Sequence, residues 1–139
     1  MSQMVRNGEE KGILLTFDEL QLLLCSCGVE EWEGIAIPVR TYEEQEVVYT
    51  IHHLIAKKIL IEQMGKIVIR EDVKTMLQMM GNPLRTQIYN FQQEYFCYED
   101  AEKVVVTERY WKRKDTIKLR LFEQEEFQNW KVRMTDDNC

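Results

Sequence analysis

Apolar residues recur at helical spacing in the first half of the chain. Thr16 lies three residues before Glu19, which is the spacing of a capping box, and the apolar side of the following turns carries Leu20, Leu23, Leu24 and Cys27. Gly28 then interrupts the pattern, as glycine commonly does just past the end of a helix. The spacing predicts a helix from Phe17 to Cys27.

A second helix is predicted after a loop that contains Gly34 and Pro38. Thr41 and Glu44 repeat the capping-box spacing, so we expect the helix to run from about Tyr42 to Lys58. One broad side of this helix is apolar and should face the core: Val47, Val48, Ile51, Leu54, Ile55 and Ile59. The loop carries three apolar residues that should fold back onto that core: Trp32, Ile35 and Ile37.

The apolar pattern then shortens to an alternation. The stretches ILIEQ (59–63) and KIVIR (66–70) predict two short strands around Met64-Gly65, where the glycine tolerates a positive φ. A helix followed by such a hairpin is the arrangement that winged-helix DNA-binding proteins use. The pattern therefore predicts a winged-helix-like unit and raises the question of whether this unit binds DNA.

A third helix and a sheet follow. The helix is predicted from Glu71 to Met80, before Gly81-Asn82-Pro83, with four residues facing inward: Val73, Met76, Leu77 and Met80. From Thr86 to Phe122 the period is two, in the stretches IYNFQQEYFCYE, KVVVTERYWKR and TIKLRLF. Turn-like pairs at Asp100-Ala101 and Lys114-Asp115 separate these stretches, which predicts an antiparallel meander.

The end of the pattern predicts how the sheet is covered. Its last strand should have one buried face, with Ile117, Leu119 and Leu121, and one solvent-exposed (wet) face, with Thr116, Lys118 and Arg120. A closing helix is predicted in EQEEFQNWKVRM, from the spacing of Phe127, Trp130 and Met134. Together the elements predict one α+β domain over residues 13–134, with a flexible N-terminus (1–12) and a loose C-terminal tail (135–139).

Composition is that of a globular protein. The 139 residues are 45% hydrophobic and 30% charged, which suits a single domain with its own core. The N-terminus MSQMVRNGEEKG has no apolar run, and the longest apolar stretch, VVYTIHHLIA, is interrupted by polar residues, so neither a secretory signal nor a membrane span is expected. The four cysteines lack the spacing of a disulfide framework, and we expect reduced thiols and a cytoplasmic location.

Charge is unevenly distributed along the chain. Residues 9–46 contain ten acids against Lys11 and Arg40, whereas residues 103–120 contain seven basic residues against two acids. A winged-helix protein that binds DNA directs cationic side chains toward the phosphates. The helix before the hairpin instead has Glu43, Glu44 and Glu46 in its first turns. This argues against binding of duplex DNA and favours a winged-helix-like scaffold, with a transcription regulator or nucleic-acid binder as the alternative.

No motif for catalysis or for a cofactor is present. The sequence lacks a G-x-S-x-G elbow, a phosphate-binding G-x-x-x-x-G-K-[ST], an H-E-x-x-H helix and a G-x-G-x-x-G turn. His52 and His53 point about 100 degrees apart on a helix and cannot bind one metal together. Cys25 and Cys27 do not share a helical face either. We therefore expect neither an enzyme nor a metal or cofactor.

The meander provides the candidate partner surface. Its strands carry large apolar groups on both faces, which is more than a one-sided core requires. The stretch 109–114 mixes aromatic and cationic residues, which are enriched at protein interfaces and also suit an acidic peptide or single-stranded nucleic acid. The alternative is that the basic residues at the tip of this hairpin bind nothing and only aid solubility. The candidate partner-binding residues are Tyr89, Phe91, Tyr95, Arg109, Trp111 and Arg113.

The order of elements resembles a known family. LTFDELQLLL, the loop EWEGIAIP, VVYTIHHLIAKKIL and GKIVIREDVKTMLQMMGNP, followed by a sheet, resemble the EspG-like chaperones of bacterial type VII (ESX) secretion over Leu14 to Trp130. The resemblance implies an α+β fold with a central antiparallel sheet, a cytoplasmic location, no catalysis, and binding to the apolar tip of a helical secretion substrate. Family members are about twice this length and look like two related halves, so the resemblance also implies pairing of two copies. It transfers no binding motif residue by residue.

These observations lead to one expected function and two alternatives. We expect a cytoplasmic, non-catalytic protein-binding module, a chaperone or adaptor for a helical type VII secretion substrate. The first alternative is the winged-helix-type regulator described above. The second is an immunity protein against a cognate toxin, since an acidic face suits a basic toxin.

Overall fold

The computed structural model describes residues 12–137 and confirms the predicted α+β class. In chain order the elements are β1 (Ile13–Thr16), α3 (Phe17–Ser26), α4 (Glu44–Ala56), β2 (Leu60–Gln63), β3 (Lys66–Ile69), α5 (Glu71–Gly81), β4 (Arg85–Asn90), β5 (Glu94–Glu99), β6 (Lys103–Arg109), β7 (Thr116–Glu123) and α6 (Gln124–Asp137). The segments predicted to be flexible lie outside the described residues, except for Gly12 and the end of α6, which continues past the expected Met134.

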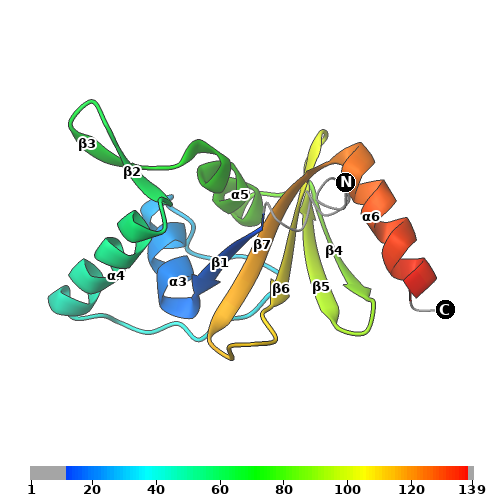
Figure 1. Ribbon diagram of the computed structural model, residues 1–139, viewed down its shortest axis with the longest axis horizontal. Helices are drawn as coiled ribbons and strands as arrows, with labels where there is room; N and C mark the ends of the chain where they lie inside the picture. The colour runs from blue at the N-terminus through cyan, green and yellow to red at the C-terminus, as the bar shows by residue number, and fades with distance from the viewer. Residues whose placement is uncertain (1–11, 138–139) are drawn as a thin grey trace, which may run out of the picture.

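A five-stranded antiparallel sheet, in the order β1-β7-β6-β5-β4, organises the described part of the chain. Helices α3 and α5 pack on one face and α6 lies on the other, whereas α4 and the separate β2–β3 hairpin extend away from the sheet (Figure 1). Each face has its own core. The first contains Leu15, Leu20, Leu24, Leu77, Met80, Ile117 and Leu119, and the second Tyr95, Cys97, Val106, Phe122, Phe127 and Trp130.

The start of α3 confirms the predicted capping box. Thr16 Oγ1 accepts a hydrogen bond from the backbone N–H of Glu19 (3.1 Å), and Glu19 Oε1 accepts one from the backbone N–H of Thr16 (2.9 Å). The residues just before this cap form β1, which the sequence pattern did not reveal. Four residues are too few to display an alternation, and the partner strand β7 lies about a hundred residues away, beyond the reach of local signals.

The predicted loop does fold back onto the core. Ile35 and Ile37 are buried, and Trp32 is partly buried. The hydroxyl of Tyr98 on β5 holds the loop, because it donates to the carbonyl of Glu33 (2.7 Å) and accepts from the N–H of Ile35 (3.1 Å). Burial raises the pKa of Tyr98 to about 12, so the hydroxyl keeps its proton.

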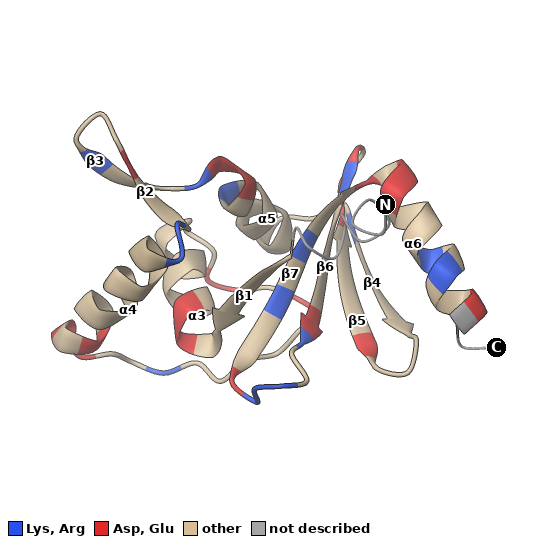
Figure 2. Ribbon diagram, in the orientation of Figure 1, with Lys and Arg blue, Asp and Glu red and all other residues tan. Residues whose placement is uncertain are grey.

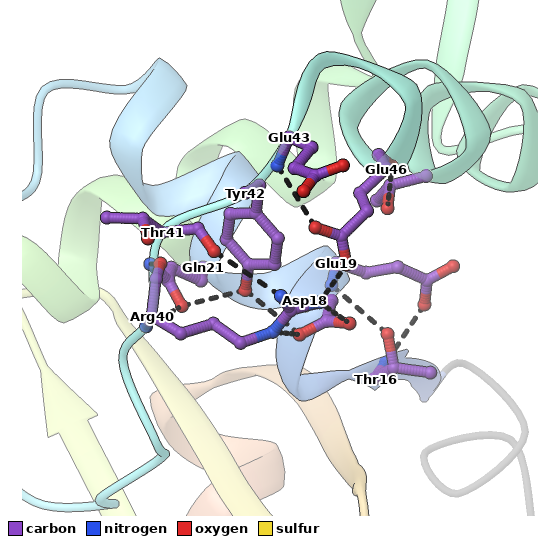
Figure 3. Close-up of polar contacts among 10 residues, drawn as sticks. Thr16, Asp18, Glu19, Gln21, Arg40, Thr41, Tyr42, Glu43 and Glu46 are labelled. Carbon is purple, nitrogen blue, oxygen red and sulfur yellow. Dashed lines mark hydrogen bonds and ion pairs between the residues drawn. The ribbon is translucent and has the colours of Figure 1, made fainter.

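Helix α4 begins two residues later than predicted, and the Thr41–Glu44 capping box is wrong. Instead, the carboxylate of Glu46 accepts a hydrogen bond from the backbone N–H of Glu43 (3.0 Å). Figure 3 shows the physical reason: the segment before the helix contacts α3 and does not form a further turn of α4. Arg40 and Tyr42 supply the side chains that make this connection.

The connection between α3 and α4 is a polar cluster. Arg40 forms ion pairs with Asp18 of α3 (3.1 Å) and with Glu46 of α4 (2.7 Å), as Figure 3 shows. The hydroxyl of Tyr42 lies 2.9 Å from Asp18 Oδ1 and 2.8 Å from Gln21 Oε1. Burial, followed by the hydrogen bond to Asp18, raises the pKa of Tyr42 to about 12. These contacts fix the first turn of α4 against α3.

The predicted hairpin and the third helix are confirmed. Met64 and Gly65 both have positive φ (54° and 79°), the signature of a two-residue type I′ turn, whose twist suits antiparallel strands. Helix α5 follows directly, and its predicted inward residues are all buried: Val73, Met76, Leu77 and Met80. The burial of α4 differs from its prediction, because Leu54 is the only residue of that helix that is fully buried.

Two details of the meander differ from the prediction. The stretch IYNFQQEYFCYE is not one strand, since a turn at residues 91–93 divides it into β4 and β5. Gln92 adopts a positive φ of 77° there, at a position that carries neither glycine nor proline to reveal the turn. The expected wet face of β7 is also wrong, because Thr116 and Arg120 are buried. Helix α6 covers that face and removes Arg120 from water.

Candidate partner-binding site

The six predicted partner-binding residues fall into two groups. Tyr89, Phe91 and Tyr95 belong to the aromatic cluster beneath α6, where the ring centroid of Tyr95 lies 5.1 Å from that of Trp130 and that of Phe91 lies 5.8 Å from it. Tyr89 packs edge-on against Phe127, at 6.0 Å between centroids. The apolar groups on the second face of the sheet therefore have a structural role, which is to bind α6.

The other group lies at the end of β6 and in the loop to β7. Trp111 is 79% exposed, and the ammonium of Lys112 lies 5.1 Å from the centroid of its ring. Arg113 is exposed in the same loop. Arg109 turns back to the body of the protein, where its guanidinium donates to the carbonyl of Ala36 (2.6 Å). The loop residues from 111 to 114 thus present one indole and three cationic side chains to solvent.

A cavity of about 250 Å³ connects the two groups. Tyr95, Arg109 and Trp111, three of the six predicted residues, line it together with Trp130 and Met134 of α6. Since a water molecule occupies about 30 Å³ of liquid, the space is large enough for a bulky side chain of a partner. We call the loop 111–114 and this cavity the tip site.

A buried ion pair lies on the floor of the tip site. Arg120 Nη2 donates to Glu108 Oε1 at 3.0 Å, and the amide of Gln93 also donates to Glu108. The guanidinium of Arg120 lies 5.6 Å from the ring centroid of Trp130, so aromatic contact replaces part of its lost hydration. Burial, and then the negative charge of Glu108, raise the pKa of Tyr95, which therefore lines the cavity as a neutral phenol.

Sequence reasoning did not assign six residues that line the cavity to a partner site: Gln93, Glu108, Lys118, Arg120, Trp130 and Met134. Glu108 and Arg120 lie on adjacent strands, two register positions apart, since β6 pairs Glu108 with Lys118 and Val106 with Arg120. A register for the β6–β7 hairpin would have brought these opposite charges together. Trp130 was assigned to the closing helix, but the face of the sheet that this helix covers could not be read from local spacing.

The tip site has the chemistry of a binding surface. Its charged groups are the buried pair, whose charges neutralise each other, and the cations of the rim, among them Lys118. Within residues 12–137, no three His, Cys, Asp or Glu side chains are grouped so that they could hold a metal ion. Likewise, no helix in that range is both long and apolar enough to cross a membrane. Such a site can accept an apolar side chain and attract acidic neighbours.

Comparison with models of known protein families finds no match to this chain, and comparison with curated proteins finds none either. The residues and contacts above are therefore what supports a function.

Proposed function

We propose that this protein is a non-catalytic protein-binding module, an adaptor or chaperone that holds a helical partner at the tip site. One observation carries the proposal: Trp111 is 79% exposed beside a cavity lined by Tyr95 and Trp130. Leaving so large an indole in water forgoes a burial free energy of about 1.5–3 kcal/mol, which a partner that covers it would recover. Tryptophan beside cations is also the composition typical of interface hot spots.

The charges of the rim indicate the chemistry of the partner. Lys112, Arg113 and Lys114 follow Trp111 in the loop, and Lys118 lines the cavity. A helix with one apolar side chain for the cavity and acidic residues one turn on either side would match this pattern. The resemblance to EspG-like chaperones adds a candidate class for the partner, a helical type VII secretion substrate in the bacterial cytoplasm.

The test begins with the full chain, tagged and recovered from its own host at moderate salt, and continues with the purified partner in titration calorimetry. Trp111→Ala should weaken binding by about 30-fold, the effect of losing a central hot spot of about 2 kcal/mol. Leu84→Ala is the matched control, since Leu84 is 77% exposed and does not line the cavity. It should leave the affinity unchanged.

Each result of the recovery experiment has a definite meaning. A small helical secreted protein whose affinity depends on Trp111 supports the proposal. A toxin domain in stoichiometric amount would instead make the protein an immunity protein. Nucleic acid that salt removes, without any protein, would favour a regulator and overturn the proposal. Equal affinities of the wild type and Trp111→Ala for a captured protein would exclude the tip site as its binding surface.

A further inference from the structure

Helix α4 has a second apolar side that no described part of the chain covers. Its inner side packs on α3 through Leu54, but on the outer side Val48 is 48% exposed, Tyr49 66% and Ile55 39%. Exposed apolar side chains that gather on one helix are uncommon on monomeric proteins and commonly mark an interface. Because α4 extends away from the sheet (Figure 1), its outer side is accessible to another molecule.

The outer side forms a continuous stripe along the helix. Glu44, Val48, His52 and Ile55 follow each other at spacings of four, four and three residues, so they lie above one another, with Tyr49 next to them. The ring of Tyr49 lies 4.4 Å from that of His53, between centroids. This contact holds the exposed tyrosine in place before anything binds, which lowers the entropy cost of using it as an anchor.

The two ends of α4 carry opposite charges, as Figure 2 shows. Glu43 and Glu44 lie at its N-terminal end, whereas Lys57 and Lys58 follow its C-terminal end. Lys58 is exposed and forms no ion pair with any described residue. A second α4 packed antiparallel would bring the acidic end of each helix to the basic end of the other, and the helix dipoles would also oppose each other favourably. A parallel arrangement would place like charges together.

We infer that α4 is the contact between two copies of this chain, packed antiparallel around a twofold axis near His52. Such an interface is isologous, so every contact occurs twice, and a self-complementary stripe of this kind is what a twofold axis requires. One helix of 13 residues is about 20 Å long. A contact of this length is smaller than standard stable interfaces, and we expect a dissociation constant of about 1–100 μM. The inference does not depend on the proposed function of the tip site.

The experiment measures the mass of the full chain by sedimentation velocity between about 1 and 300 μM, which brackets the expected dissociation constant. The wild type should pass from monomer to dimer over this range. Glu44→Lys and Lys58→Glu should each weaken the dimer by about 10-fold, because each places like charges at two symmetric positions. The double variant exchanges the charges and should return to within about threefold of the wild type.

A matched pair of substitutions separates the surface from general effects on folding. Val48→Glu places a carboxylate among the apolar side chains of the stripe and should leave the chain monomeric at every concentration. Val132→Glu makes the same change on α6, where Val132 is 60% exposed, and should leave the dimer unchanged. Circular dichroism and the melting temperature of each variant check that it folds.

Three results would overturn the inference. The wild type could remain a monomer throughout the concentration range. The dimer could persist unchanged in Val48→Glu, which would place the interface elsewhere. The charge exchange could fail to restore what the single variants lose, which would exclude the antiparallel arrangement. The dimer should also be unaffected by Trp111→Ala, so a failure of the inference and a failure of the proposed function can be told apart.

Discussion

Arg120 and Glu108 form an ion pair that is almost completely shielded from water between the sheet and α6. Transfer of both charges out of water is costly, and their mutual attraction, the amide of Gln93 and the ring of Trp130 offset that cost. The pair therefore contributes little net stability while both members are present. Either charge alone would be buried without a counter-ion.

Arg120→Met should consequently lower the free energy of unfolding by about 3–5 kcal/mol, since it leaves the Glu108 carboxylate buried and unpaired. The double variant Arg120→Met with Glu108→Leu should recover most of that loss, because the two apolar side chains can pack beneath α6. Urea unfolding of the three proteins measures both effects. Arg113→Met, at an exposed position, is the control. A loss below about 1 kcal/mol in the single variant would contradict the argument.

At the scale of the elements, the position of α4 depends on a few exposed polar contacts at its first turn. Arg40 lies between Asp18 and Glu46 and links two helices that share only part of their surfaces. The guanidinium lowers the pKa of Glu46 below its ordinary value. A carboxylate whose pKa is lowered on folding adds stability above the pKa of the unfolded chain, and this stability is lost as the pH falls through the pKa of the folded protein.

Glu46→Gln should therefore lower the melting temperature at about pH 7, and the difference from the wild type should shrink as the pH falls through the lowered pKa of the wild-type carboxyl. Differential scanning calorimetry at a series of pH values measures the difference. Glu125→Gln, at an exposed position in the first turn of α6 and without an ion pair among the described residues, is the control. A difference in melting temperature that stays the same size at every pH would show that the Arg40 contact is not its source.

The elements also show what local sequence can and cannot reveal. Helices α3 and α5 were predicted because their signals, apolar residues at helical spacing and a glycine at or just past the end, are local to each helix. The beginning of α4 was misplaced because Arg40, in the segment before the helix, pairs with Asp18 of α3. This contact, between residues far apart in sequence, keeps the segment out of the helix. Strand β1 and the β4–β5 turn were missed for a related reason, since their positions depend on pairing with other strands of the sheet. The tip site was predicted in part, since Trp111 was recognised but its cavity depends on α6.

At the scale of the whole molecule, two cores share one sheet. The first joins α3 and α5 to its first face, and the second joins α6 to the opposite face. Strands β5, β6 and β7 contribute side chains to both cores. A sheet with both faces covered accounts for the large apolar groups that first suggested a partner surface on Tyr89, Phe91 and Tyr95. It also means that neither core can loosen without affecting the strands of the other.

Phe127→Ala should for this reason destabilise the whole fold and not α6 alone. Phe127 is fully buried against Trp130, and its loss should cost about 3–5 kcal/mol. Far-UV circular dichroism, which follows all helices, and tryptophan fluorescence should report a single coincident transition in the variant and in the wild type. Phe91→Ala, at a partly buried position in the same cluster, should cost less. Two separate transitions would mean that the cores unfold independently.

Strand β1 affects the order in which the elements can assemble during synthesis. It pairs with β7, and Ile13 lies opposite Leu119. At a synthesis rate of about 5–20 residues per second, the ribosome needs roughly 5–20 s to make the intervening hundred residues or so. During this interval the backbone hydrogen-bonding groups of β1 have no partner strand, and Leu15 has no sheet to pack against. The helices can form early, but the central sheet closes only after β7 has left the ribosome.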